Sequence, residues 1–157
     1  GVQTCALPIY ERGHVYITGR LKEIIVMSNG EKIPPVDIES AIMCDTLFEH
    51  VMLIGEGKPF LSLLAVLNSG RWKQLAAEQG IADAATATGS AAAEKLLLAR
   101  VAAQMKAFPG YAQVRKVTAT LEPWTVEDGL LTPTLKIKRP RVMEKFNAEI
   151  DGMYSGH

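Results

Sequence analysis

The sequence predicts an α+β fold, in which a small three-stranded sheet is covered by helices and preceded by a two-stranded β-hairpin. Three observations point to this class. The chain has 157 residues, of which 48% are hydrophobic, enough for one domain with a core and too little for two. Short apolar runs of strand length alternate with segments of helical spacing. Gly or Pro separates most of these segments, as turns require.

The first two strands are expected near the amino terminus. Residues 14–18 (HVYIT) alternate with β-branched side chains, and residues 23–27 (EIIVM) form a short apolar run. A turn around Gly19–Lys22 would pair them as a hairpin. Residues 1–9 (GVQTCALPI) resemble translated adapter sequence, so we expect a non-native or disordered leader. A flexible native segment is the alternative.

A helix over about residues 36–44 follows. Pro35 suits its first turn, because the missing N–H of proline has no helical partner there. Asp37 and Glu39 favour the positive end of the helix dipole. We therefore interpret Pro35 and Glu39 as structural residues.

Three further runs supply the sheet. Residues 48–54 and 60–67 flank the turn Gly55–Pro59, and residues 114–121 alternate in the manner of a strand. The run over 60–67 (FLSLLAVL) is nearly all apolar, which is typical of a central strand.

Three more helices are expected around that sheet. Ser69 is a candidate cap for a helix over 70–79. Ser90 opens a second helix, which Phe108–Gly110 stops. A single last helix is predicted from about Pro140 to Met153.

Composition excludes several classes of function. The chain has 17 basic and 17 acidic residues, so it lacks the positive charge typical of nucleic-acid binding. Two cysteines, Cys5 and Cys44, form neither a disulfide framework nor a zinc quartet, and a reducing cytosolic setting fits them best. The three histidines are dispersed, so we predict no metal ligands. No nucleophile elbow, phosphate loop or dinucleotide fingerprint occurs.

Three segments carry the remaining chemical signal. They are Gly19–Ile25 (GRLKEII), Gly30–Glu39 (GEKIPPVDIE) and Leu131–Arg139 (LTPTLKIKR). Together they resemble the carboxy-terminal lid domain of the adenylate-forming (AMP-binding) enzymes. The third segment is most similar to that of long-chain fatty acid–CoA ligases. The resemblance covers about residues 13–150.

This resemblance implies a fragment of a long-chain fatty acid–CoA ligase. Such enzymes convert fatty acid and ATP to acyl-adenylate and pyrophosphate, and CoA then yields acyl-CoA and AMP. A large amino-terminal domain binds ATP, Mg²⁺ and the acyl chain, while the small domain is a lid that rotates between the half-reactions. Residues 10–21 would end the amino-terminal domain, with the hairpin at the interdomain hinge. Residues 22–157 would form the lid.

The resemblance assigns Lys136 as the catalytic residue for adenylation. Negative charge accumulates when a carboxylate attacks the α-phosphate, and a lysine ammonium can offset it. Without the resemblance, Lys136 would be one solvated lysine in a basic run. One position departs from the pattern, because Leu135 stands where many members have Gly.

Three other residues match functional positions of the family. Arg20 matches an arginine that contacts the nucleotide, Lys22 matches the hinge, and Gly30 lies in a loop that lines the pantetheine tunnel. Their ordinary alternatives are a surface ion pair, an exposed turn lysine and a plain turn glycine. The basic cluster Lys136–Arg141 either attracts the phosphates of ATP and CoA or simply begins the last helix in solvent.

The expected partners are the missing amino-terminal domain and the substrates fatty acid, ATP and CoA, with no nucleic acid. We expect a cytoplasmic location, with peripheral association of the parent enzyme at a membrane left open. Two alternatives remain for function. One is an adenylate-forming enzyme for another carboxylic acid, and the other is a freestanding, non-enzymatic α+β binding module. As a fragment, the chain is predicted to fold but not to catalyse alone.

Overall fold

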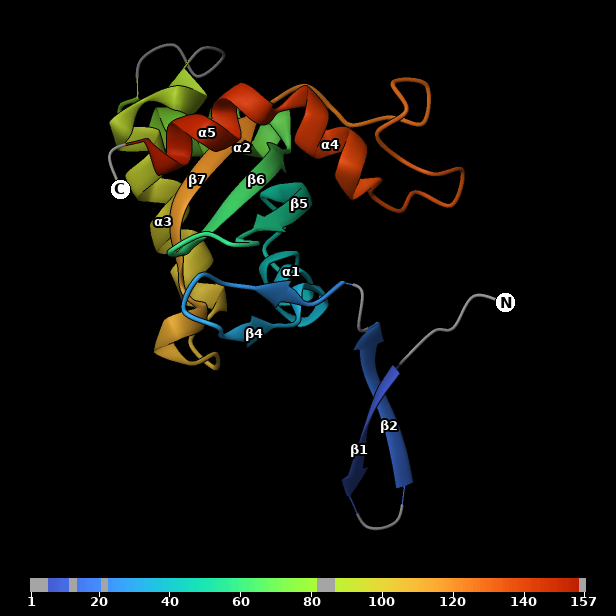
Figure 1. The fold of residues 1–157 in the computed structure, drawn as a ribbon. Coiled ribbons are helices and arrows are strands. Elements are labelled where there is room, and N and C mark those ends of the chain that lie inside the picture. Colours follow the sequence, from blue (N-terminus) through green and yellow to red (C-terminus); the bar gives the residue numbers. More distant parts are fainter. Residues whose placement is uncertain (1–5, 12–13, 21–22, 82–86, 156–157) are drawn as a thin grey trace.

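The computed structural model of the chain describes residues 6–11, 14–20, 23–81 and 87–155. Its strands and helices form an α+β fold (Figure 1). The strands are β1 (Ala6–Glu11), β2 (His14–Arg20), β3 (Ile25–Val26), β4 (Lys32–Ile33), β5 (Phe48–Ile54), β6 (Leu61–Leu67) and β7 (Val114–Thr120). The α-helices are α1 (Pro35–Ile42), α2 (Ser69–Glu78), α3 (Ala91–Gln104), α4 (Arg139–Lys145) and α5 (Asn147–Tyr154). Short 3₁₀ turns occur at Ala87–Gly89 and Gly110–Ala112.

The central sheet has three strands in the order β5-β6-β7, which confirms the predicted fold class. β5 and β6 are antiparallel, whereas β6 and β7 are parallel. A parallel pair needs a long crossover connection, and α2 and α3 supply it. β6 is the middle strand and all seven of its residues are buried, as the apolar run predicted.

The predicted pairing of residues 14–18 with residues 23–27 is wrong. β2 instead pairs with β1, and β3 pairs with β4. The turn after β3 explains the second pairing, because Gly30 takes a φ of 85° and its N–H bonds the Met27 carbonyl at 2.9 Å. Because the turn is short, pairing β4 with β3 costs little loop-closure entropy.

Residues 6–9 lie in β1, a strand that the sequence had not predicted. Their backbone pairs with β2, which extends to Arg20, into the segment where the sequence predicted a turn. Whether the first nine residues are native, and where the domain boundaries fall, stay predictions.

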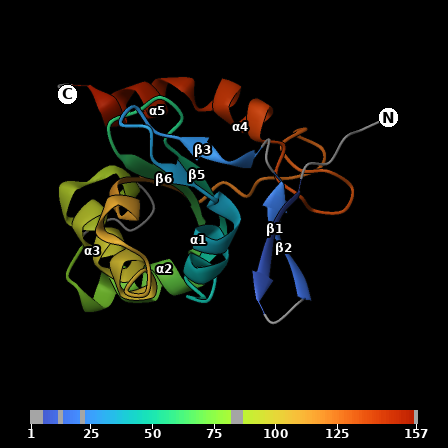
Figure 2. The same cartoon turned by 60° about the horizontal axis from the view of Figure 1, so that its bottom comes forward.

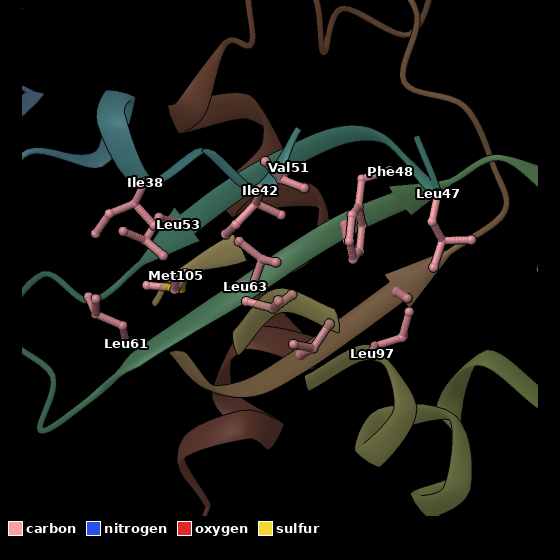
Figure 3. Packing of buried hydrophobic residues seen from close by; sticks show 14 of the residues in the cluster. Ile38, Ile42, Leu47, Phe48, Val51, Leu53, Leu61, Leu63, Leu97 and Met105 are labelled. Carbon is pink, nitrogen blue, oxygen red and sulfur yellow. The ribbon is translucent and has the colours of Figure 1, made fainter. Parts of the chain in front are cut away.

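The sheet buries side chains on both faces. Successive residues of a strand point to opposite sides. Leu53 and Leu63 therefore pack among residues of α1 and α3 (Figure 3), while Met52 and Leu64 pack with residues of α4 and α5. Figure 1 shows α5 lying over the sheet on that second side.

The helix boundaries correct two predictions. The cap of α2 is Asn68, whose side-chain oxygen accepts the Arg71 N–H at 3.0 Å, and Ser69 is already helical. The last helix is two helices, because Phe146 leaves helical geometry at φ −105° and ψ 25°. Ser90 does cap α3, as predicted, by accepting the Ala93 N–H at 3.2 Å.

Candidate functional site

The segment that carries Lys136 is a short hairpin-like loop. Leu131 and Ile137 form an antiparallel bridge at its base. The Thr132 N–H bonds the Lys136 carbonyl at 2.8 Å, and the Leu135 N–H closes a turn on the Thr132 carbonyl at 2.8 Å. The Thr132 hydroxyl also accepts the Lys136 N–H at 3.0 Å. Lys136 therefore projects from a turn whose backbone is defined by hydrogen bonds.

Leu135 has a left-handed backbone conformation, which is strained for a leucine. Its φ of 61° makes it the only non-glycine residue with positive φ in the described part of the chain. A turn followed by a left-handed residue is a common hairpin design in which that residue is usually Gly. The family glycine that the sequence lacks would fit this conformation, and Leu135 adopts it in spite of its side chain.

A cleft of about 540 Å³ opens beside Lys136. One side of its lining comes from the lysine loop and the start of α4, and the remainder comes from α1, β5 and Glu23. The lining includes Leu135, Lys136, Arg139, Glu39, Met43 and His50. Lys136 is exposed and makes no ion pair with any residue that the structure describes. Its ammonium is thus available to an anionic group.

Arg139 and Glu39 form an ion pair at the edge of the sheet. Both side chains also bind the backbone of Leu53 in β5. The Leu53 N–H donates to Glu39 Oε1 at 2.7 Å, and Arg139 Nη1 donates to the Leu53 carbonyl at 3.2 Å. Glu39 was predicted to be a dipole partner of its helix, but its carboxylate is committed to this tertiary contact. Sequence reasoning missed this role, since no local pattern links residues 100 positions apart.

The surroundings of Glu39 raise the pKa of its carboxyl group. Burial raises the pKa of Glu39, and the opposing effects of Arg139 and of the Leu53 N–H do not fully offset it. The charge of Glu23 also raises this pKa. Burial lowers the pKa of His50, which lines the same cleft. The cleft is therefore a place where charge is partly desolvated.

Trp124 stacks on His50, one of the residues that line the cleft. The two rings are stacked with centroids 6.1 Å apart and an interplanar angle of 11°. Trp124 is buried and packs on Phe146 at the break between α4 and α5. Its Nε1 has no hydrogen-bond partner among the described residues. Trp124 therefore belongs to the hydrophobic core between the sheet and the last two helices.

Gly30 lies in a different place. It sits in the exposed turn between β3 and β4, where a Cβ atom would meet nothing within 4 Å. Ser28 of the same turn donates its N–H to the Lys58 carbonyl at 3.0 Å in the turn between β5 and β6. Figures 1 and 2 show the β3–β4 turn and the segment before α4 at opposite ends of the body. The structure does not bring Gly30 and Lys136 together.

The other predicted site residues are described less fully. Arg20 ends β2, and only its backbone belongs to the described structure. Lys22, the predicted hinge residue, lies outside the described residues. The roles of both residues stay predictions.

The basic cluster Lys136–Arg141 divides into different environments. Arg139 is turned inward to Glu39, whereas Arg141 makes an exposed ion pair with Glu144 at 3.3 Å. The cluster is therefore no uniform strip of free cations. Lys136 is the member of the cluster that stands on the rim of the cleft without an ion-pair partner in the described structure.

The residues present suit a phosphate-bearing ligand better than a metal ion. Lys136 offers an exposed cation, which suits phosphate or carboxylate oxygens. Within the described ranges, no three His, Cys, Asp or Glu side chains meet in a way that could hold a metal. The expectation that Mg²⁺ binds elsewhere in a larger enzyme stays a prediction.

Comparison with known proteins defines the class of this fold and site. The family model of the AMP-binding enzyme C-terminal domain matches residues 22–157. The chain belongs to that family. The predicted resemblance is thereby confirmed.

The curated relatives are more specific. The chain is 32% identical over 152 residues to the long-chain-fatty-acid–CoA ligase FadD15 of Mycobacterium tuberculosis, covering 92% of this chain and 25% of that protein. It is 31% identical over 162 residues to the human long-chain-fatty-acid–CoA ligase ACSBG1, covering 90% and 22%. The chain thus spans about a quarter of the length of these relatives.

Solved structures share the fold. The adenylation and carrier didomain of a carboxylic acid reductase from Segniliparus rugosus, in complex with AMP, superposes with a TM-score of 0.75 at 19% identity. That match covers 92% of this chain and 19% of the reductase chain. A fatty acyl CoA synthetase of Mycobacterium tuberculosis superposes with a TM-score of 0.52 at 19% identity, covering 88% and 22%. In the described part of this chain, no helix is long and apolar enough to cross a membrane.

Proposed function

We propose that the chain is the mobile lid of a long-chain fatty acid–CoA ligase and that Lys136 promotes its adenylation half-reaction. The observation that carries this proposal is the placement of Lys136. Its ammonium is exposed and without an ion-pair partner among the described residues, at the rim of a cleft and on a turn fixed by backbone hydrogen bonds. The long-chain ligases among the relatives supply the substrate class.

The chemistry explains why a cation is needed at this position. In adenylation, a carboxylate oxygen of the fatty acid forms a bond to the α-phosphorus of ATP, and the bond to the leaving pyrophosphate breaks. The reacting groups repel one another because both carry negative charge. A lysine that lies between them in the closed enzyme offsets this repulsion and is worth most where water is excluded.

The position of Gly30 supports a lid with two working faces. The β3–β4 turn and the lysine loop lie at opposite ends of the body (Figure 2). A rotation of the lid would withdraw Lys136 from the partner domain and present the Gly30 turn to it. A glycine with an open Cβ position permits close approach of the CoA arm to the backbone.

Three further assignments complete the proposal. Arg20 would contact the nucleotide, and Lys22 would be the hinge that absorbs the change in φ and ψ. ATP and CoA would be shared with an amino-terminal adenylation domain, and Mg²⁺ would be held by that domain. Peripheral association of the whole enzyme with a membrane is kept as a prediction.

The test is the substitution Lys136→Ala in an intact ligase that carries this domain. Adenylate formation should fall by roughly 10²- to 10³-fold, because one preorganised charge at the transition state is lost. Thioester formation from supplied acyl-adenylate and CoA should change little, since Lys136 is then withdrawn. Pyrophosphate release and acyl-CoA formation measure the two half-reactions separately.

Two results would contradict the proposal. An equal loss in both half-reactions would remove the specific role of Lys136. Turnover of fatty acid, ATP and CoA by this 157-residue chain alone would exclude a lid that needs a partner domain.

A further inference from the structure

We propose that Glu39 and Arg139 are positioning residues for Lys136 and act as one clamp on the edge of the sheet. This inference rests on the proposed role of Lys136 and deepens it. The clamp is defined as Glu39, Arg139 and the backbone of Leu53. Its function is to hold the base of the lysine loop against α1 and β5, so that the ammonium enters the closed enzyme in a fixed place.

The clamp closes on a strand edge. β5 is an outer strand of the β5-β6-β7 sheet, so its outer backbone groups lack a neighbouring strand. Glu39 accepts the N–H of Leu53, Arg139 donates to the carbonyl of the same residue, and the two side chains pair with each other. Both polar groups of one residue are thus satisfied by two side chains that are themselves joined. Such an arrangement fixes α4 to α1 and β5 at a single point.

The connection from the clamp to Lys136 is short. Arg139 follows Lys136 by three residues and begins α4. Between them the Lys138 N–H bonds the Leu130 carbonyl at 2.8 Å, and Leu131 pairs with Ile137. Leu130 and Leu131 are both 2% exposed. One end of the loop is therefore anchored by apolar burial and the other by the ion pair.

The burial of the pair favours a positioning role over a merely solvated contact. The side chain of Arg139 is 29% exposed and that of Glu39 is 16% exposed, whereas Arg141 and Glu144 are 69% and 73% exposed. Exposed pairs fix little, because water competes for both partners. The two pairs begin only two residues apart on α4, so Arg141–Glu144 is a matched control.

The experiment measures the two half-reactions in an intact ligase with this domain. Glu39→Gln and Arg139→Met should lower the adenylation rate by roughly 10- to 100-fold, because a small misplacement of a reacting group has effects of this size. The loss should lie in kcat rather than in the KM for ATP. Arg139→Lys keeps the charge and should recover part of the rate. Arg141→Ala should change neither half-reaction.

A double substitution separates positioning from stability. If the clamp acts through Lys136, adding Glu39→Gln to Lys136→Ala should lower adenylation no further, whereas two independent effects would multiply. Full thioester formation from supplied adenylate shows that each variant is folded. Should Arg139→Met fail to fold, Glu39→Gln and Arg139→Lys carry the test.

The outcomes distinguish this inference from the function on which it rests. If Lys136→Ala leaves adenylation unchanged, the proposed function fails. If Lys136→Ala lowers adenylation but Glu39→Gln and a folded Arg139→Met do not, or if their effects persist undiminished in the Lys136→Ala background, the clamp is overturned. A loss in adenylation alone that vanishes in that background supports it.

Discussion

Two of the ion pairs among the described residues, Asp45–Arg100 and Glu39–Arg139, join a carboxylate to an arginine but differ in geometry. Asp45 pairs with Arg100 of α3 through two bonds, from Nε to Oδ2 at 2.7 Å and from Nη2 to Oδ1 at 2.9 Å, and also accepts the Leu47 N–H. In the Glu39–Arg139 pair, the arginine and the Leu53 N–H converge on Oε1 alone. The first pair engages both carboxylate oxygens and the second engages one.

The pKa values follow this difference. Burial acts to raise both, but for Asp45 the hydrogen bonds from Arg100 and Leu47 outweigh it and lower the pKa. For Glu39 burial prevails and the pKa is raised. Both side chains have little exposed surface, 6% for Asp45 and 16% for Glu39, but more protein surrounds the Glu39 carboxyl, so burial raises its pKa more strongly. The two-bond geometry of Asp45–Arg100 suits a purely stabilising pair, in contrast to the positioning proposed for Glu39–Arg139.

The largest expected effect comes from breaking the first pair. Asp45→Asn should lower the free energy of unfolding of the chain by about 2 kcal/mol, because a charged hydrogen-bond fork is lost and Arg100, itself 39% exposed, is partly rehydrated. Urea denaturation measures the change. In an intact ligase, Asp45→Asn should leave the ratio of the two half-reactions unaltered. A selective loss of adenylation would show that Asp45–Arg100 also positions Lys136, which would contradict the proposed difference between the two pairs.

The second prediction concerns pH, and it has opposite signs for the two pairs. Asp45 has a lowered pKa, so its contribution is complete above its unfolded value of about 3.9 and is lost as the pH falls through the folded value. Glu39 has a raised pKa, so its ionised form opposes folding at neutral pH. That opposition disappears as the pH falls through the folded value.

Denaturation of three proteins from pH 7 to pH 3 tests this contrast. The stability advantage of the wild type over Asp45→Asn should shrink as the pH falls, with most of the change below about pH 4. The stability of the wild type relative to Glu39→Gln should rise over a higher pH range. Two differences that move in the same direction would show that the pairs are alike.

The smallest expected effect tests whether the turn or the clamp holds Lys136. Leu135→Gly should raise the free energy of unfolding by about 0.5 kcal/mol, because relief of a left-handed leucine exceeds the entropy lost by glycine. Adenylation should change less than about threefold if the clamp holds the base of the loop. A loss as large as that of Glu39→Gln would assign the positioning to Leu135.

Gly30→Ala is the matched control for this turn. Gly30 has a φ of 85°, and a Cβ atom added there would meet nothing within 4 Å, so the substitution introduces strain without a clash. It should lower the free energy of unfolding by about 1 kcal/mol, which thermal unfolding measures. Leu135→Gly should therefore stabilise the chain, whereas Gly30→Ala should destabilise it.

Most elements could be predicted because their signals are local. The apolar run over 60–67, the Pro35 helix start and the Ser90 cap each depend on a few neighbouring residues. The first hairpin was predicted wrongly because two apolar runs indicate strands but not which strands pair. The choice was made by the local turn at Gly30.

The sequence by itself determined the class of fold, the family and the candidate lysine. Each of these depends on the order of turn, proline and charged residues along the chain, which can be recognised without a structure. Only the tertiary structure decided what surrounds Lys136. Glu39 and Arg139 lie 100 residues apart and meet because the edge of β5 brings α1 and α4 to Leu53. Sequence spacing reports contacts within one element, whereas a contact between elements depends on how their buried faces pack.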